Sequence, residues 1–528
     1  MLAPKNCEFV LMNFSHLMRV CLFAIVSIFG ARTVLAEVAL QYHCAGGMQL
    51  AADTRLISLH KVLNLPSTIN FENIALAKFA RSLTDGLRFG NNPSSALLIK
   101  PLLKDVIQRE SLCSYGEVAS NGSSFILALP LEPARVQFWQ ESFAKLFGGA
   151  GDDFSSEGFK GRRWRAGGSN FYWTIPAKDW LLAGSGDDFS SLRNEYLGEI
   201  KAHGRPAPAL TESWLKADLS AGSLGGCFHV LKPARINVTI AIKEDDLHLN
   251  ARLLEAEAIP WKPEPWRIPK ELIRGQIISF VAGENVAAFL NINPAVSRLA
   301  SNPMTNQFYV WALDQMPLLN YMAWPVDHAS NALQQLSAEA PAALNPILKR
   351  FNGTELNWDS KAGRLLWLNM RLFVPSLSVL KEAEGEFLFL ASFPRTANSK
   401  PLSDALVGQI QSHSNLVYYD WELTCSRLAE LQILGRIIAN RAEGQTSDVT
   451  DAYFIEGRWL GDVAHLAATT VTEITHSAPN ELSVERKAPM GFTAVELLLL
   501  ADWLCDANSG PIHSPPSAPS LSPLQKHP

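Results

Sequence analysis

"ARINVTIAIKEDDLHLNARLL", residues 234–254, alternates apolar and polar side chains along two runs separated by a Glu-Asp-Asp turn. A repeat of two places the apolar side chains of each run on one face of a strand. These apolar positions are Ile236, Val238, Ile240 and Ile242, followed by Leu247, Leu249, Ala251 and Leu253. A hairpin with one apolar and one polar face is typical of an antiparallel sheet that is covered on one side.

The residues before this hairpin predict helices that supply the cover. "NFENIALAKFARSLTDGL" (70–87) and "ARVQFWQESFAKLF" (134–147) repeat apolar residues at helical spacing. A third helical stretch, 94–109, contains Pro101, and we expect this proline to interrupt the helix and start a new turn.

Between these helices, residues 111–131 predict a second hairpin. Its two apolar runs flank Asn121-Gly122, a pair that favours a tight turn. Helices and antiparallel hairpins together predict an α+β fold, in which sheets are covered by helices.

The second half of the chain repeats the pattern of the first. "GEFLFLASFP" (385–394) is similar to "SSFILALPLEP" (123–133), since both are apolar strands that end at proline ahead of a helix. Residues 415–437 likewise correspond to 179–200, as a strand, a polar cap and a helix with an apolar face. We therefore predict two related α+β modules that arose by an ancient duplication.

A proline-rich stretch, "IPWKPEPWRIP" (259–269), separates the two halves and predicts a stiff connector between domains. We expect Trp261 and Trp266 to hold it against one domain; the alternative is that they offer stacking surfaces for sugars or for a hydrophobic partner. The prediction divides the chain into a signal peptide, a first α+β module, the connector, a second α+β module and a disordered Pro/Ser-rich tail, at residues 1–36, 37–258, 259–269, 270–506 and 507–528.

The N-terminus predicts export. Arg19 precedes the apolar run 20–30, and Val34 and Ala36 are the small residues that a signal peptidase requires. An uncleaved anchor is the alternative, but eleven apolar residues are short for a membrane span of about 20 residues. The start codon is left open among three methionines, Met1, Met12 and Met18. We expect a periplasmic or extracellular bacterial protein with no transmembrane span after cleavage.

"GDDFSS" occurs twice, at 151–156 and 186–191. The second copy precedes a predicted helix, so its Asp and Ser oxygens are suited to cap the free N–H groups of the first turn. The first copy is predicted to be a loop whose acidic residues are neutralised by the nearby arginines of "GRRWR" (161–165). Neither copy has the acidic spacing of a calcium loop.

No motif identifies a catalytic, cofactor or metal site. Phosphate loops and HExxH are absent, and the serine in "AGSLG" (221–225) lacks the helix that a nucleophile elbow needs. Asp420 and Glu422 share one strand face, which suits acid/base chemistry, but we favour a solvated face. The scattered histidines, among them His229, His248 and His465, are expected to satisfy local hydrogen bonds rather than bind metal.

Cysteine spacing also argues against zinc. Five cysteines remain after cleavage, widely spaced and without CxxC, and their disulfide pairing is left open: Cys44, Cys113, Cys227, Cys425 and Cys505. We expect most of them to be small buried hydrophobes.

A net charge of −5 gives no indication of nucleic-acid binding. The segments 42–68, 180–188, 203–208 and 416–428 resemble a group of uncharacterised exported bacterial proteins with a duplicated α+β layout, a resemblance that implies export and carries no functional residues.

The function that we expect is therefore non-catalytic. An exported envelope protein would bind or scaffold another protein, or an apolar ligand held between sheet and helices. The alternative is an extracytoplasmic hydrolase whose site is assembled from distant residues. A cluster of titratable groups in a deep pocket would favour the enzyme, and an apolar groove without one would favour the binder.

Overall fold

The computed structural model describes most of the chain. The described residues are 38–86, 93–118, 122–156, 159–166, 169–177, 179–186, 189–220, 233–259, 261–284, 306–314, 320–349, 354–369, 373–393, 402–439 and 457–505. The signal peptide, the tail, Asp187, Asp188 and the "AGSLG" segment lie outside these ranges, so the predictions made for them remain predictions.

The fold is α+β, and the described residues build one antiparallel sheet of twenty strands. Strands β1 to β10 come from the first half of the chain: β1 Val38–Cys44, β2 Ser111–Val118, β3 Gly122–Pro130, β4 Asp152–Ser156, β5 Phe159–Ala166, β6 Ser169–Ala177, β7 Trp180–Ser185, β8 Leu215–Ser220, β9 Pro233–Lys243 and β10 Asp246–Glu255. Strands β11 to β20 come from the second half: β11 Ile277–Glu284, β12 Gln307–Leu313, β13 Asn320–Pro325, β14 Glu355–Asp359, β15 Arg364–Leu368, β16 Ser376–Glu382, β17 Gly385–Ala391, β18 Leu416–Leu423, β19 Thr469–Ala478 and β20 Glu481–Ala488.

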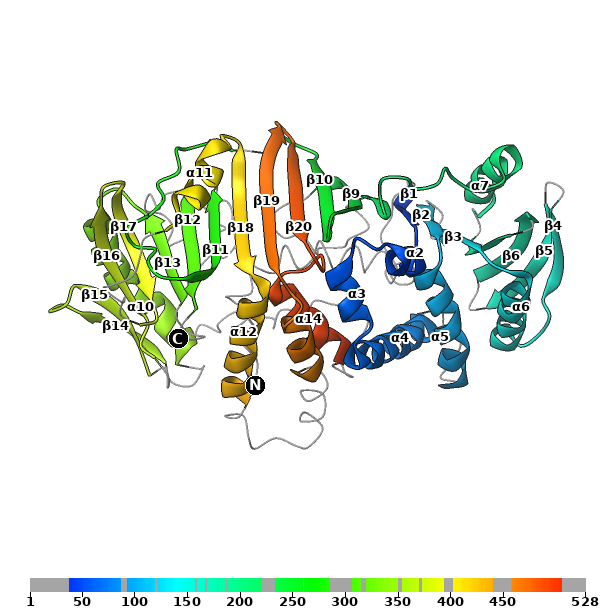
Figure 1. Cartoon of the computed structure of the whole chain (residues 1–528), viewed down its shortest axis with the longest axis horizontal. Helices are drawn as coiled ribbons and strands as arrows, with labels where there is room; N and C mark the ends of the chain where they lie inside the picture. The colour runs from blue at the N-terminus through cyan, green and yellow to red at the C-terminus, as the bar shows by residue number, and fades with distance from the viewer. Residues whose placement is uncertain are drawn as a thin grey trace, which may run out of the picture.

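The strands lie side by side along the long axis of the molecule, with β10 and β20 near its middle (Figure 1). From one edge to the other, the hydrogen-bonded strand pairs give the order β4-β5-β6-β7-β3-β2-β1-β8-β9-β10-β20-β19-β18-β11-β12-β13-β17-β16-β15-β14. Each strand of the first half thus has its counterpart at the mirrored place, ten numbers higher.

The register follows the same two-fold relation. Where the halves meet, Leu249 pairs with Arg486 and Ala251 with Val484, so Ala251 and Arg486 occupy equivalent positions. Farther out, Tyr42 lies between Cys113 and Ala217. Val281 lies in the same way between Val310 and Asp420. The structure therefore relates the halves by an approximate two-fold axis, while their descent from one duplicated ancestor stays a prediction.

Helices cover both faces of this sheet. The face that carries Tyr42, Cys113 and Leu127, here called the cavity face, packs against helices of both halves. The helices on or beside that face are α2 Gly47–Ala52, α3 Ile57–Leu63, α4 Pro66–Gly86, α5 Pro93–Gln108, α6 Pro133–Phe147, α10 Ala329–Leu348, α12 Thr424–Ala439 and α14 Ala494–Cys505. The opposite face is covered by α7 Phe189–His203 in the first half and α11 Asp404–Ser412 in the second. The prediction that helices cover one face of the sheet was therefore incomplete, because helices cover both faces.

Most predicted elements are confirmed, among them the hairpin β9–β10 and helices α4 and α6. Two predictions were wrong. Helix α5 continues through Pro101, because the missing N–H and the ring are tolerated at a position that faces partly outward. The first GDDFSS forms strand β4 rather than a loop, since it pairs with β5 along its whole length.

The pairing of equivalent segments was also wrong. The strand equivalent to β3 is β13. Strand β3 pairs with β7 as β13 pairs with β17, and each of β3 and β13 ends at a proline ahead of a helix. The predicted partner of β3, residues 385–394, contains β17, which holds the place of β7.

The Pro-rich connector lies against the second half. The Trp261 indole N–H donates to Glu284 Oε2 at 3.2 Å, and the ring of Trp266 meets Tyr309 edge-on. This confirms that the tryptophans hold the connector in place. Because β10 and β20 join the halves in one sheet, the connector is not the only link between them.

Among the described helices, none is long and apolar enough to span a membrane.

Candidate functional site

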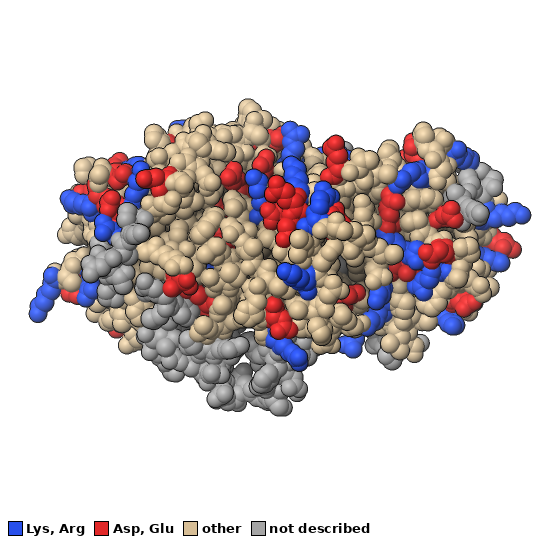
Figure 2. Space-filling view, in the orientation of Figure 1, with Lys and Arg blue, Asp and Glu red and all other residues tan. Residues whose placement is uncertain are grey.

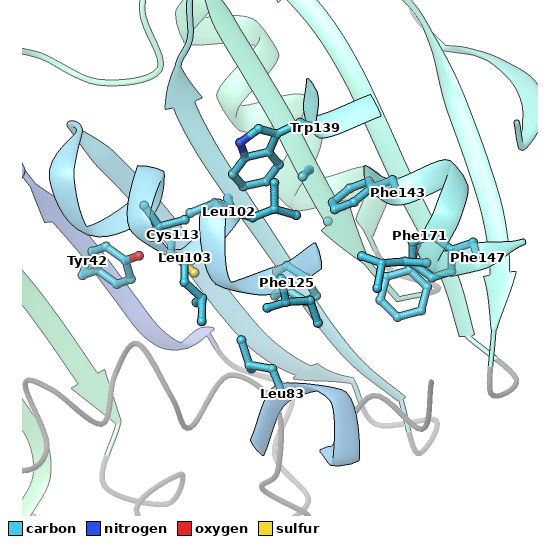
Figure 3. A pocket seen from close by; sticks show the side chains of 16 residues that line it. Tyr42, Leu83, Leu102, Leu103, Cys113, Phe125, Trp139, Phe143, Phe147 and Phe171 are labelled. Carbon is cyan, nitrogen blue, oxygen red and sulfur yellow. The ribbon is translucent and has the colours of Figure 1, made fainter. Parts of the chain in front are cut away.

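An apolar cavity of about 120 Å³ lies between the cavity face of the first half and helices α4, α5 and α6. Figure 3 shows its lining side chains, with Tyr42 and Cys113 on one side and Phe143, Phe147 and Phe171 on the other. Its lining is Tyr42, Leu83, Ile99, Leu102, Leu103, Val106, Cys113, Phe125, Leu127, Trp139, Phe143, Leu146, Phe147, Phe171, Ala183 and Gly184. None of these side chains is charged.

Helix periodicity supplies one wall of the cavity. Residues 99, 102, 103 and 106 recur at helical spacing on α5, so all four face the sheet. Asp105, one position beside this stripe, is buried against α6. Its Oδ2 accepts a hydrogen bond from Trp139 Nε1 at 2.7 Å and forms an ion pair with Arg135 at 2.5 Å. These contacts hold α5 and α6 together over the cavity.

Small residues on β7 supply its floor. Ala183 pairs with Leu127, and the equivalent pair of the second half is Leu390 with Met322. The second half thus places a leucine where the first half has an alanine. Because a leucine side chain would project into the space above β7, the small residue at 183 leaves room for the cavity.

The cavity is electrostatically neutral and chemically inert. Burial raises the pKa of the Cys113 thiol and of the Tyr42 hydroxyl, so both keep their protons at neutral pH. A thiol that stays protonated is a poor nucleophile. The lining therefore suits an apolar ligand better than hydrolytic chemistry.

A second group of titratable residues lies on the same face of the sheet, in the second half. Asp420 and Glu422 on β18, Arg486 on β20 and Glu496 in the first turn of α14 converge there; we call these four the polar cluster. Arg486 Nη1 donates to Glu496 Oε2 at 2.7 Å, and Glu422 Oε1 accepts from the Ala494 N–H at 2.7 Å.

The polar cluster corrects the prediction of a solvated strand face. Glu422, Arg486 and Glu496 are 4%, 3% and 6% exposed, because α14 begins directly over them. Burial, with repulsion from Glu422, raises the pKa of Asp420 to about 7. Burial also raises the pKa of Glu422. Each of the three carboxylates accepts at least one hydrogen bond from the protein's own groups.

The remaining candidates are structural. Arg162 and Arg163 form cross-strand ion pairs with Asp153 and Asp152 at 3.0 and 3.6 Å, which confirms the predicted neutralisation. Cys44 and Cys113 are buried free thiols, and Cys425 is a partly buried one. No group of His, Cys, Asp or Glu suited to hold a metal occurs among the described residues. Charges of both signs are interspersed over the surface seen in Figure 2.

Comparisons with known proteins add little. No protein-family model and no curated protein matches the chain. Crystal forms III, IV and I of TP0453 match with TM-scores of 0.22, 0.22 and 0.23 at 11%, 10% and 9% identity. They cover 44%, 43% and 45% of this chain and 80%, 79% and 80% of TP0453. A likeness this weak carries no argument.

Sequence reasoning identified the helices around the cavity but not the cavity. Its lining comes from eight elements between residues 42 and 184, and no single segment contains a recognisable motif. The one available signal was Ala183-Gly184 inside an otherwise bulky apolar strand, since small residues in a strand often mark a close approach or a space.

Proposed function

We propose that this chain is a non-catalytic, exported envelope protein that binds the alkyl or aromatic part of a small apolar ligand in the cavity of its first half. The observation that supports this proposal is a lining of sixteen residues without one charged side chain. Apolar cavities of about 150 Å³ stay dry and bind benzene, so a space of about 120 Å³ suits a ring or a short alkyl segment.

The spread of the lining side chains favours an alkyl chain over a compact ring. Side chains line the space from Tyr42 to Phe147, and the methylenes of a chain would contact aliphatic residues of α5 along the way (Figure 3). Each buried methylene would contribute about 0.8 kcal/mol, so affinity should rise with chain length until the cavity is filled.

Export is part of the proposal and rests on the N-terminal sequence pattern alone. If the signal is cleaved after Ala36, the mature protein begins at Glu37, which N-terminal sequencing of native protein tests. Native protein that retains residues 20–30 would overturn this part of the proposal.

A homologous series of alcohols, from hexanol to dodecanol, tests ligand binding. Binding is measured by calorimetry and by the rise in melting temperature, because a ligand at about 100 times its Kd stabilises the folded state by about 2.7 kcal/mol. The Ala183→Leu variant imports the residue of the second half and should abolish binding while the protein stays folded.

The matched control is Leu390→Ala, the reciprocal exchange at the equivalent strand position. It should retain alcohol binding, because it leaves the lining of the first-half cavity intact. Equal binding by wild type and Ala183→Leu, or no binding by the wild type across the series, would refute the proposed function.

A further inference from the structure

The two halves differ most clearly in what they bury at equivalent positions. Register places Asp420, Glu422 and Arg486 of the second half at the positions of Ala217, Leu219 and Ala251. Two further positions change from aliphatic to hydroxyl, from Ile236 to Thr470 and from Val238 to Thr472. The apolar set is 7%, 2%, 1%, 0% and 1% exposed, and it forms part of a dry core.

A fold of this kind therefore does not require charge at these positions. Replacing an apolar core by buried charges is unfavourable unless each charge is paired, because every ion must leave water. The second half has nonetheless placed three carboxylates around one guanidinium at the start of α14.

The charge count leaves the cluster short of cations. Asp420 accepts a hydrogen bond from the Tyr418 hydroxyl at 3.4 Å, while Arg486 donates to Glu496 at 2.7 Å. Arg427 and Glu430 of α12 add one charge of each sign, and Arg427 lies near Glu422. From β19 the cluster meets only Thr470 and Thr472, which are neutral, so the described surroundings carry an excess of negative charge whenever every carboxyl is ionised.

The free carboxylate oxygen points to the same conclusion. Glu496 Oε1 is buried and has no hydrogen-bond donor among the described residues. Its other oxygen accepts hydrogen bonds from Arg486 and from the Thr493 N–H. The second of these bonds caps the first turn of α14. A proton shared within the cluster would relieve the repulsion among these carboxyls and would keep α14 seated on β18.

Helix α14 connects the polar cluster with the wall of the cavity. Leu497 and Ala501 of α14 pack in one core with Phe71 of α4. Phe79, two turns farther along α4, packs against both this core and the core that contains Leu83, Ile99 and Leu103. Those last three side chains line the cavity.

We propose that the polar cluster is a proton-binding site that regulates the cavity through α14 and α4. With a proton bound, α14 stays seated and α4 keeps the cavity wall in place. When the proton is lost, the excess negative charge loosens the first turn of α14, and the apolar ligand binds less tightly. This inference rests on the proposed function, because the regulated site is the same cavity.

The test is the affinity for the longest alcohol that binds, measured at about pH 6 and about pH 8.5, on either side of the pKa of about 7. We expect binding to be at least about five-fold weaker at the higher pH, the lower end of typical coupling between two sites. By linkage, binding near pH 7 should also take up protons. Calorimetry in buffers of different ionisation enthalpy measures that uptake.

Asp420→Asn removes the titration of Asp420 without removing the side chain, and it should bind the alcohol with little pH dependence and little proton uptake. Asp420→Ala, which imports the residue of the first half, should behave in the same way and covers the case in which the amide does not fold. Asp218→Asn on β8, where the aspartate pairs with Arg235 at the surface, is the matched control and should retain the pH dependence.

The outcomes separate the two proposals. Alcohol binding that is equal at both pH values in the wild type, or a pH dependence that Asp420→Asn retains, overturns the proton-linked regulation and leaves the proposed function intact. An absence of binding at either pH overturns the proposed function and, with it, the regulation.

Discussion

Replacement of Arg486 by methionine should strongly destabilise the second half of the sheet. The guanidinium donates to Glu496 Oε2, Thr472 Oγ1 and the Gly491 carbonyl at 2.7, 2.9 and 3.4 Å. Methionine fills a similar volume but leaves Glu496 and its neighbouring carboxyls without their cation.

Removing one partner of a buried ion pair costs about 3–5 kcal/mol of stability. We therefore expect Arg486→Met to lower the free energy of unfolding by about that amount at neutral pH. The loss should shrink as pH falls, because the carboxyls left behind take up protons and cease to be buried charges. Urea unfolding at several pH values, followed by near-ultraviolet circular dichroism, measures both effects.

A companion variant tests the reasoning behind this number. Arg486→Met/Asp420→Ala/Glu496→Gln removes three of the four charges of the polar cluster together and leaves Glu422, which keeps its hydrogen bonds from the Ala494 N–H and the Thr424 hydroxyl. Buried ion networks replaced as a set are often neutral in stability. We expect this variant to recover to within about 2 kcal/mol of wild type. A loss below about 1 kcal/mol for Arg486→Met, or a triple variant no more stable than the single one, would show that the charges do not act as one unit.

Three further predictions concern stability. The raised pKa of Asp420 means that the folded state holds a proton that the unfolded state releases near pH 4, so the stability that this group contributes is lost as pH rises towards 7. Asp420→Asn should remove about 2–4 kcal/mol of that loss. The measurement is urea unfolding of wild type and variant at about pH 4.5 and pH 8, compared as the wild-type-minus-variant difference. Asp152→Ala/Asp153→Ala should cost less than about 1 kcal/mol of stability, since both ion pairs are exposed. Calcium should leave the melting temperature unchanged, and a calcium-dependent rise that the double variant loses would reveal a metal site instead. Pro101→Ala restores a helical N–H inside α5 and should raise the melting temperature, with stabilisation of about 1–3 kcal/mol, whereas a lowered value would show that the proline ring makes a packing contact which the helix needs.

Local patterns in the sequence predicted most elements correctly. The alternation in 234–254 predicts strands because side chains in an extended chain point to opposite faces in turn, and β9 and β10 bury the expected residues. Helices α4 and α6 follow in the same way from helical spacing. The predictions failed where contacts with residues far away in the sequence outweighed local preference. Strand β4 forms because β5 pairs with it, and α5 continues through Pro101 because the parts of the helix before and after the proline are both packed.

The tertiary structure alone determined the relation between the halves and both candidate sites. Sequence similarity aligned 385–394 with β3, whereas hydrogen bonding across the sheet shows that β13 holds that place, because strand order depends on pairings between residues far apart in the chain. The cavity and the polar cluster have the same origin. Ala183 contributes to a cavity only because α5 and α6 lie over it in the fold. The aspartate and glutamate of "YYDWEL" form a buried cluster only because α14 lies over them.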